Sequence, residues 1–448
     1  MSKTFSIGGI HPIDRKFSKD RPIEDLPVPQ RVYLPMNQHL GMPSVPIVKK
    51  GDRVKVGQPV AEAAGFVSAP VHASVSGTVA DVALYPDFQG KRVLTVVIET
   101  EGDEWLEGID RTSQLKQEIT TVPEETFRKI KEMGIVGLGG AAFPTHVKLT
   151  PIEGMQPEYL ILNGSECEPF LTSDYRLMLE HGQEILIGAE LMRRVLGTDV
   201  NGIIGIEENK PLAISAMQKI AANYLQWKVV PLKKRYPQGG EKQLIDAVLG
   251  RKVASFALPI STGAIVQNVG TAFAVYEAVQ KSKPLLSNVL TVTGSGPTIQ
   301  KNYRFRIGTS MRDILYSAGA LDPEGNLLPQ FAKLVSGGPM MGKAVVNLQA
   351  PVVKSSSALL LLTEKETKRQ EPGDCIRCAK CFQACPMHLQ PYLLYQLALA
   401  GRTEELEKHR VFDCIECGCC LYTCPAHIPL LDQIRLAKNA SLKNKRKK

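Results

Sequence analysis

The sequence predicts a multidomain α+β protein, and three observations carry that prediction. Short apolar runs separated by Gly and Pro fill the first hundred residues, helical and strand patterns alternate between about 123 and 283, and cysteines crowd the C-terminal part. A chain of 448 residues is long enough to bury several separate cores. We therefore expect an N-terminal β domain, an α/β domain, a second small β module and a C-terminal helical cysteine domain.

Composition and charge exclude several classes of protein. With 44% hydrophobic and 22% charged residues, the chain is neither disordered nor fibrous. It has no apolar run of transmembrane length and no signal-peptide pattern at its start, so we expect a soluble or peripheral protein made in the cytosol. Much of the net charge of +9 lies in an acid-free tail at 438–448, which argues against a nucleic-acid-binding surface. Such a tail is usually solvated, although it could also touch an anionic membrane surface.

Residues 1–110 predict an N-terminal segment followed by a small β-barrel or sandwich. Runs such as VYLPM, VPIVKKGDRVKVGQPVA and RVLTVVIET have strand lengths and turn signals between them. The phrase VKKGDRVKVGQ at 48–58, followed by SGTV at 76–79, resembles the barrel-sandwich fold of biotinyl and lipoyl carrier domains. No lysine lies between Val56 and Gly90, so we expect a structural or docking role without an attached cofactor arm.

Residues 120–285 predict an α/β domain with a largely parallel sheet. Helical periodicity in EETFRKIKEM and GQEILIGAELMRRVL alternates with the buried-strand runs YLILN and NGIIGIE. Residues 286–362 predict a compact β-grasp module of the SLBB-like type. The charged segment TEKETKRQEPG at 363–373 ends in Pro-Gly and is predicted to be a linker.

Residues 369–437 form a cysteine domain with two identical motifs. Of the 10 cysteines, all but Cys167 lie between Cys375 and Cys424, and two C-x2-C-x2-C-x3-C-P runs account for eight of these. This spacing is typical of proteins with two 4Fe-4S clusters, in which the fourth cysteine of each run ligates the other run's cluster. Zinc sites favour paired C-x2-C knuckles, and disulfides are disfavoured in a reducing cytosol. The predicted ligand sets are Cys375, Cys378, Cys381 and Cys424 for one cluster, and Cys385, Cys414, Cys417 and Cys420 for the other.

The second cysteine run contains one thiol more than a cluster needs. Matching the register of the first run selects Cys420 as a ligand and leaves Cys419 spare. The two runs begin an internal repeat, and the stretch 390–410 between them is predicted to be helical. This connection resembles that of the α-helical type of ferredoxin.

A Gly-rich loop, GLGGAAFPTHVK at 137–148, is the candidate phosphate or flavin site. Its glycines let backbone N–H groups approach a ligand closely, and Lys148 could neutralise a phosphate. The spacing matches neither the Rossmann nor the P-loop pattern.

Four ordered blocks resemble the flavin- and NADH-binding subunit of respiratory complex I. The loop is similar to GRGGAGFPTGLKW, and NGSECEP at 163–169, GEKQL at 240–244 and VQNVGT at 266–271 are similar to NADESEPG, GEETAL and VNNVET. Together with the opening GGIHP, the barrel, the β-grasp module and the cysteine runs, nearly the whole chain resembles the C subunits of Rnf ion-translocating ferredoxin:NAD oxidoreductase complexes.

The resemblance implies FMN on the Gly-rich loop with Asn163, Lys148 and Asn268 around it, and NAD(H) stacked over the flavin near Glu166, Glu168 and Glu241. Residues implied to bind these cofactors are Gly137, Gly139, Gly140, Ala141, Lys148, Asn163, Glu166, Glu168, Glu241, Asn268 and Thr271. The chain departs from the complex I pattern where Leu138, Ala142 and His146 replace an arginine and two glycines. Cys167 replaces a serine and is expected to be a small buried residue. Plainer alternatives are that the two glutamates are surface carboxylates and that Asn268 only caps a helix.

The function that follows is a peripheral subunit of a membrane-bound electron transport complex. The resemblance implies that it exchanges hydride between NAD(H) and FMN, passes single electrons through two 4Fe-4S clusters, and lies at the cytoplasmic face of the membrane. It would reach the membrane only through partner subunits of the Rnf complex, including a ferredoxin-like iron-sulfur subunit. One alternative, a sodium-pumping quinone reductase subunit, lacks the cysteine runs. Another is a non-enzymatic relay or adaptor with a degenerate flavin site.

Overall fold

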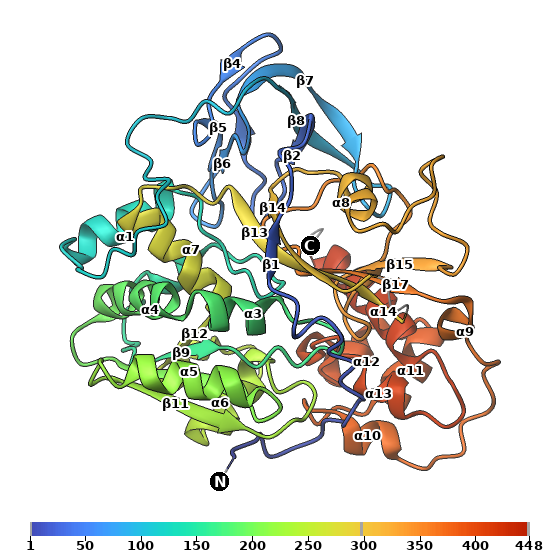
Figure 1. Ribbon diagram of the computed structural model, residues 1–448. Coiled ribbons are helices and arrows are strands. Elements are labelled where there is room, and N and C mark those ends of the chain that lie inside the picture. Colours follow the sequence, from blue (N-terminus) through green and yellow to red (C-terminus); the bar gives the residue numbers. More distant parts are fainter. Residues whose placement is uncertain (1, 296–298, 446–448) are drawn as a thin grey trace.

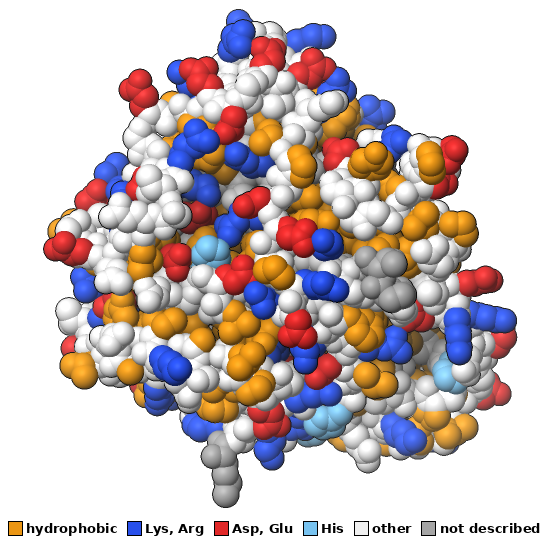
Figure 2. All heavy atoms as spheres, viewed as in Figure 1, with side chains coloured by type: hydrophobic (Ala, Val, Ile, Leu, Met, Phe, Trp, Pro, Cys, Tyr) orange, Lys and Arg blue, Asp and Glu red, His pale blue; other side chains and the backbone are white. Residues whose placement is uncertain are grey.

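The computed structural model describes residues 2–295 and 299–445, which form four bodies around a shared centre (Figure 1). The barrel lies at the top of this view, the α/β domain at the lower left, a mixed sheet in the middle and the helical cysteine domain at the lower right. On the face shown in Figure 2, acidic and basic side chains are interspersed. In the described part of the chain, no helix has both the length and the apolar composition needed to cross a membrane.

The N-terminal β domain is built from two facing sheets, as the sequence predicts. Strands β2 (Arg31–Pro35), β8 (Arg92–Thr100), β7 (Gly77–Pro86) and β4 (Arg53–Val54) form one antiparallel sheet in that order. Strands β3 (Val45–Pro46), β5 (Pro59–Glu62) and β6 (Val71–His72) form the other. Val32, Val60 and Ile98 are fully buried between them. Alternating apolar residues on short strands therefore fill a single small core.

The α/β domain has a parallel sheet of four strands, which confirms the predicted architecture. Its order is β11 (Trp227–Leu232), β10 (Asn201–Glu207), β9 (Tyr159–Asn163) and β12 (Ala264–Asn268). Core contacts place α4 (Gly182–Leu196) and α7 (Val269–Gln280) on one face and α6 (Glu241–Leu249) on the other. The remaining helices are α1 (Pro123–Glu132), α2 (Thr145–Leu149), α3 (Ser173–Glu180) and α5 (Pro211–Ala221). Because the strands are parallel, their carboxyl ends share one edge.

A mixed sheet of six strands occupies the predicted β-grasp region. Its order is β1 (Ile23–Asp25), β14 (Lys301–Arg306), β13 (Ser287–Gly294), β17 (Ala358–Leu362), β15 (Lys333–Ser336) and β16 (Lys343–Ala344). The hairpin β13–β14 is followed by α8 (Met311–Ser317), and β17 returns parallel to β13. The edge strand β1 comes from the N-terminal segment and was not expected from the sequence.

In the described part of the cysteine domain, the regular elements are helices joined by loops. It contains α10 (Lys380–Ala384), α11 (Pro391–Leu399), α12 (Thr403–Lys408), α13 (Cys419–Thr423) and α14 (Leu430–Lys445). The stretch 390–410 is two helices and not one, because the chain turns at Gly401 with φ of 65°. The predicted linker also begins with a short helix, α9 (Glu364–Thr367), whose capping box joins Thr363 and Glu366.

The basic tail is not simply solvated. Helix α14 continues to Lys445, and Lys438 donates hydrogen bonds to the Cys414 carbonyl at 2.7 Å and to Glu416 at 3.0 Å. Residues 446–448 lie outside the described residues, so the prediction for Arg446, Lys447 and Lys448 stays a prediction.

The first residues of the chain run across the other bodies. We call residues 3–25 the N-terminal strap. Lys3 bridges to β11 at Leu232, Ile10 pairs with Tyr236, and β1 pairs with β14. Gly9 donates a 2.9 Å hydrogen bond to the Ala384 carbonyl of the cysteine domain. The sequence grouped this segment with the barrel, yet these contacts join it to the other three bodies.

The contact between α4 and α7 gives a test of the fold. A Cβ atom at Gly188 would lie 1.8 Å from the Ala272 carbonyl oxygen of α7. Gly188→Ala should therefore push the helices apart and lower the free energy of unfolding by about 2 kcal/mol. The measurement is the midpoint of thermal unfolding, with exposed Ser215→Ala on α5 as control. Equal midpoints for wild type and Gly188→Ala would show that this helix contact is misplaced.

Candidate functional site

The candidate flavin site lies at the carboxyl edge of the parallel sheet. Strands β9 and β12 end at Asn163 and Asn268, which are partners in register. A Cβ atom at Gly139 would lie 3.3 Å from the Asn268 Cβ, so the Gly-rich turn lies directly beside this edge. The Leu138 amide donates a 2.9 Å hydrogen bond to the Thr271 hydroxyl. The structure thus brings together three of the four blocks, which are far apart in the sequence.

The tip of the Gly-rich turn is open to solvent. Gly139, Gly140 and Ala141 are exposed, while the turn is closed behind them by a 2.8 Å hydrogen bond from Gly137 to the Phe143 carbonyl. Gly140 has φ of 108°, and a Cβ atom there would meet nothing within 4 Å. A ligand can therefore approach the exposed backbone closely.

The departures from the complex I pattern are explained by contacts to the barrel and the core. Leu138 and Ala142 are buried, and the Ala142 carbonyl accepts a 3.1 Å hydrogen bond from Leu40 of the barrel. His146 is buried too, 3.0 Å through Nε2 from the Phe66 carbonyl, and its ring meets the Phe66 ring edge-on. These side chains lie away from the exposed turn, so the departures adapt the loop to the adjoining domain.

Lys148 and Glu241, predicted to contact different cofactors, are paired with each other. The Lys148 Nζ donates to Glu241 Oε1 at 2.7 Å and to the Val266 carbonyl at 3.0 Å. Lys148 comes from α2 and Glu241 is the first residue of α6, so the pair closes one side of the site.

Glu166 has the features of a ligand-binding residue. Its Oε1 accepts a 2.8 Å hydrogen bond from the Asp174 amide, whereas its buried Oε2 has no hydrogen-bond partner among residues 2–295 and 299–445. Within the same described residues, the neighbouring Ser165 hydroxyl is likewise buried and unpartnered. Glu166 also has φ of 44°, a left-handed conformation that is rare outside glycine. Buried polar atoms are normally satisfied, so these two oxygens indicate a missing polar partner.

Glu168 holds the backbone of a neighbouring turn. Its two carboxylate oxygens accept hydrogen bonds from the Met341 amide at 2.8 Å and the Met340 amide at 3.1 Å. These amides belong to the turn between β15 and β16, and burial raises the pKa of Glu168 to about 7. The carboxylate therefore joins the α/β domain to the mixed sheet.

Cys167 lies between these two glutamates and faces the cysteine domain. Burial raises the pKa of its thiol to about 12, and its sulfur accepts a 3.3 Å hydrogen bond from Gly239. It packs in one apolar cluster with Tyr236, Cys417 and Cys419.

Asp174 is a residue that the sequence analysis missed. Asn268 Nδ2 donates to its Oδ2 at 2.7 Å, and burial raises the pKa of the carboxyl to about 7. Asn268 also caps α7 by accepting a 2.7 Å hydrogen bond from Gly270, so it does cap a helix, but the bond to Asp174 shows that capping is not its only contact. Asp174 follows Thr172 and Ser173 in the first turn of a helix, a pattern that marks many helix starts and is not specific for a site.

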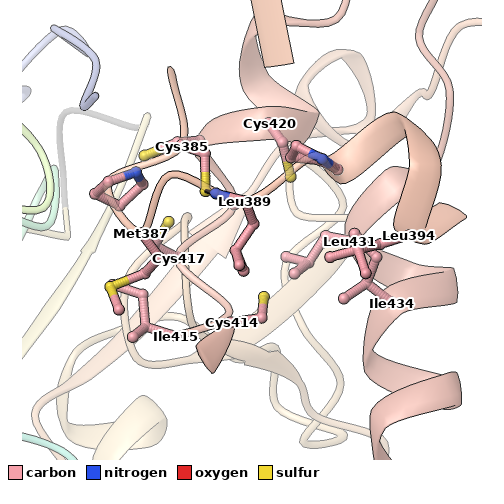
Figure 3. A pocket seen from close by; sticks show the side chains of 14 residues that line it. Cys385, Met387, Leu389, Leu394, Cys414, Ile415, Cys417, Cys420, Leu431 and Ile434 are labelled. Atoms are coloured by element: carbon pink, nitrogen blue, oxygen red, sulfur yellow. Dashed lines mark hydrogen bonds between the residues drawn. The ribbon is translucent and has the colours of Figure 1, made fainter. Parts of the chain in front are cut away.

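The second predicted cluster site is gathered around one cavity (Figure 3). We call its four predicted ligands the inner set: Cys385, Cys414, Cys417 and Cys420. They line this cavity together with Leu389, Leu394, Leu431 and Ile434. Cys385 comes from the first run and the other three from the second, which is the interleaving that the motif predicts. Thiolates in an apolar cavity fit a 4Fe-4S cluster.

The remaining cysteines, Cys375, Cys378, Cys381 and Cys424, form the outer set. Cys375 and Cys378 are exposed, while Cys381 and Cys424 are partly buried and pack against the same small cluster around Ile428. The two runs share one backbone conformation, with left-handed residues at three matching positions. These pairs have φ of 54° and 57° at Arg377 and Glu416, 57° and 80° at Ala379 and Gly418, and 54° and 53° at His388 and His427. The outer loop is therefore shaped like the inner one.

Cys419 lies beside the inner set. It is fully buried as the first residue of α13, it lines the same cavity, and its thiol interacts with that of Cys417. Its sulfur also lies 3.9 Å from the Tyr236 carbonyl of the α/β domain. The register that leaves Cys419 spare therefore stays a prediction.

Comparison with known families covers the three regions that carry these sites. Residues 3–103 match the RnfC barrel sandwich hybrid domain, residues 130–277 the Nuo51 FMN-binding domain and residues 367–425 the 4Fe-4S dicluster domain.

Relatives match along nearly the whole chain. The C subunit of the proton-translocating ferredoxin:NAD(+) oxidoreductase complex of Clostridium ljungdahlii is 44% identical over 88% of this chain and 84% of its own length. The Na(+)-translocating counterpart of Acetobacterium woodii is 41% identical over 98% of both chains. The C subunit of the ion-translocating oxidoreductase complex of Rhodobacter capsulatus is 40% identical over 97% of this chain and 83% of its own length.

Two serine substitutions test the cysteine register. Cys419→Ser should keep about eight irons per chain, because the motif register does not use this thiol, whereas Cys420→Ser should lose or convert one cluster. Iron analysis and electron paramagnetic resonance of the reduced proteins give the answer. Loss of a cluster in Cys419→Ser, with Cys420→Ser intact, would overturn the register.

Proposed function

Because the chain belongs to the family of C subunits of ion-translocating ferredoxin:NAD(+) oxidoreductase complexes, we propose a specific division of labour among its domains. The exposed Gly-rich turn holds FMN, the loop 164–172 holds NAD(H), and the inner and outer cysteines hold two 4Fe-4S clusters. When bound, FMN would exchange hydride with NAD(H), and the two clusters would carry single electrons. The chain is thus the NAD-linked subunit of an oxidoreductase complex.

The observation that carries this function is the meeting of the Gly-rich turn, both asparagines and Glu166 at one sheet edge. Open backbone at Gly140 fits a flat or phosphorylated ligand, and the unpartnered oxygens of Ser165 and Glu166 fit a polar one. Hydride transfer needs no general acid or base, so the residues here position the cofactors and exclude water. No catalytic side chain is assigned.

We assign NAD(H) to Glu166 in preference to Glu168. Both were expected to contact the nucleotide, yet both oxygens of Glu168 are occupied by backbone amides of the 337–342 turn. Lys148, Glu241 and Thr271 line or support the same edge and remain part of the proposed set.

The two sets of cysteines face different surroundings. Tyr236 donates a 2.9 Å hydrogen bond to the Cys417 carbonyl, and Gln243 donates a 3.3 Å hydrogen bond to the Pro386 carbonyl, so the inner set lies against the α/β domain. Cys375 and Cys378 of the outer set are exposed. We therefore assign the inner set to the flavin side and the outer set to the side of the redox partner.

Family membership makes the chain a subunit of a complex. Its specific partners and its location are part of the proposal. We propose that the chain joins other subunits of the Rnf complex, including a ferredoxin-like iron-sulfur subunit, and lies peripherally at the cytoplasmic face of the membrane. The proposed domains are 1–110, 120–285, 286–362 and 369–437, with a basic tail at 438–448. The hairpin, helix and returning parallel strand of the third domain support its assignment as an SLBB-like β-grasp module.

The relay alternative gains no support from the altered residues. Leu138, Ala142 and His146 are buried, while the tip of the Gly-rich turn at 139–141 is exposed.

Flavin binding and NADH oxidation test the function directly. The purified chain should carry a yellow chromophore that NADH bleaches. Gly139→Val should release FMN, because its side chain would displace Asn268, whereas the smaller Gly139→Ala should retain more. FMN per chain is measured after gel filtration. Stoichiometric FMN in Gly139→Val would place the flavin elsewhere.

A matched pair of substitutions separates the two glutamates. Glu166→Gln should raise the KM for NADH about tenfold, since a charged hydrogen bond is weakened, with flavin and iron retained. Glu168→Gln should leave this KM unchanged but lower the thermal midpoint, because it weakens the bonds to Met340 and Met341. The reverse pattern would return the nucleotide to Glu168.

A further inference from the structure

One lysine of the N-terminal strap enters the loop assigned to NAD(H). The Lys16 Nζ donates hydrogen bonds to the carbonyls of Glu166 at 2.7 Å, Glu168 at 2.9 Å and Leu171 at 2.7 Å. Lys16 lies at least 150 positions before these residues, so a distant part of the chain sets the local shape of the loop. The three carbonyls converge on a single ammonium group, which satisfies all its donors.

The rest of the strap holds Lys16 in place. Phe170 donates a 2.8 Å hydrogen bond to the Asp14 carbonyl, and the hydroxyls of Ser18 and Thr172 lie 2.6 Å apart. The rings of Phe17 and Phe170 meet edge-on at 5.8 Å. The strap therefore runs alongside the loop on both sides of Lys16.

The loop needs such support because its backbone is strained. Glu166 and Phe170 both have left-handed conformations, with φ of 44° and 72°. Lys210 supports the loop as well, through a 2.6 Å hydrogen bond to the Ser165 carbonyl. Without Lys16, three carbonyl dipoles would face one another around an empty space, and the loop would relax.

The ammonium is held among charges of both signs. Burial, followed by the nearby Lys210, lowers the pKa of Lys16, while Glu166 and Glu207 oppose this shift. Charge-assisted hydrogen bonds to buried carbonyls are stronger than neutral ones, so the arrangement suits a residue that fixes a backbone.

We propose that Lys16 is a positioning residue for NAD(H) binding, which makes the N-terminal strap part of the nucleotide site. This inference rests on the proposed function, because it assumes that NAD(H) contacts the loop at 164–172. Lys16 acts through the backbone: it holds Glu166 in the left-handed conformation that leaves Glu166 Oε2 available. The residue itself does not touch the reacting atoms.

The test compares Lys16→Met with Lys16→Arg and with Lys19→Met, whose exposed lysine lies three positions on. The KM for NADH is measured with ferricyanide as acceptor, and amide hydrogen exchange is followed in the free protein at 164–172. Lys16→Met should raise the KM about tenfold and speed exchange in this loop, with kcat, FMN and iron retained. Lys16→Arg should recover part of the affinity, and Lys19→Met should match wild type.

A purely structural role would give a different pattern. A lower thermal midpoint in Lys16→Met with unchanged KM and exchange would overturn the proposal. If Lys16→Met does not fold, Lys16→Gln replaces it, and a wild-type KM in that variant overturns the proposal equally. If the wild-type protein does not bind NADH, the proposed function itself is wrong. If the wild-type protein and the Lys16 variant bind NADH equally well, only the role of Lys16 is wrong.

Discussion

The arrangement of the molecule depends on one buried tyrosine between the α/β domain and the cysteine domain. Tyr236 is 2% exposed, its hydroxyl donates to the Cys417 carbonyl, and its backbone pairs in both directions with Ile10 of the strap. Burial, with the nearby Glu168 adding to it, raises the pKa of Tyr236 far above its ordinary range, so the phenol stays a neutral donor. A hydrogen bond shielded from water in this way fixes the inner cysteine loop against the α/β domain.

Other contacts between the domains also use backbone groups. Glu168 receives two amides of the 337–342 turn, and Gly418 of the cysteine loop packs against the Met340 carbonyl of that turn. The turn is thus held between the α/β domain and the inner set of cysteines. Two redox centres that exchange electrons need a fixed separation, and rigid contacts made by backbone and buried carboxylate provide it better than exposed ion pairs do.

Local patterns predicted much of the fold and of the cysteine site. Period and turn signals identified β9, β10 and α4, and the motif spacing grouped Cys385 with three cysteines of the second run, which line one cavity with it. The register that leaves Cys419 spare stays a prediction. The SLBB-like assignment of the mixed sheet stays a prediction. The environment of Glu168 and the position of Lys16 escaped prediction, because both depend on residues more than 150 positions away. Hydrophobic periodicity reports which face of an element is buried, but it does not say which distant segment covers it.

The path of the strap has a consequence for how the chain is made. Gly8 and Gly9 lie against the backbone of Cys385 and Ala384, and there is no room for a side chain at either glycine. Those partners are synthesised some 375 residues later. The strap therefore leaves the ribosome long before its partners, and contacts so distant in sequence form slowly. It can reach its final position only after the first cysteine run has been synthesised.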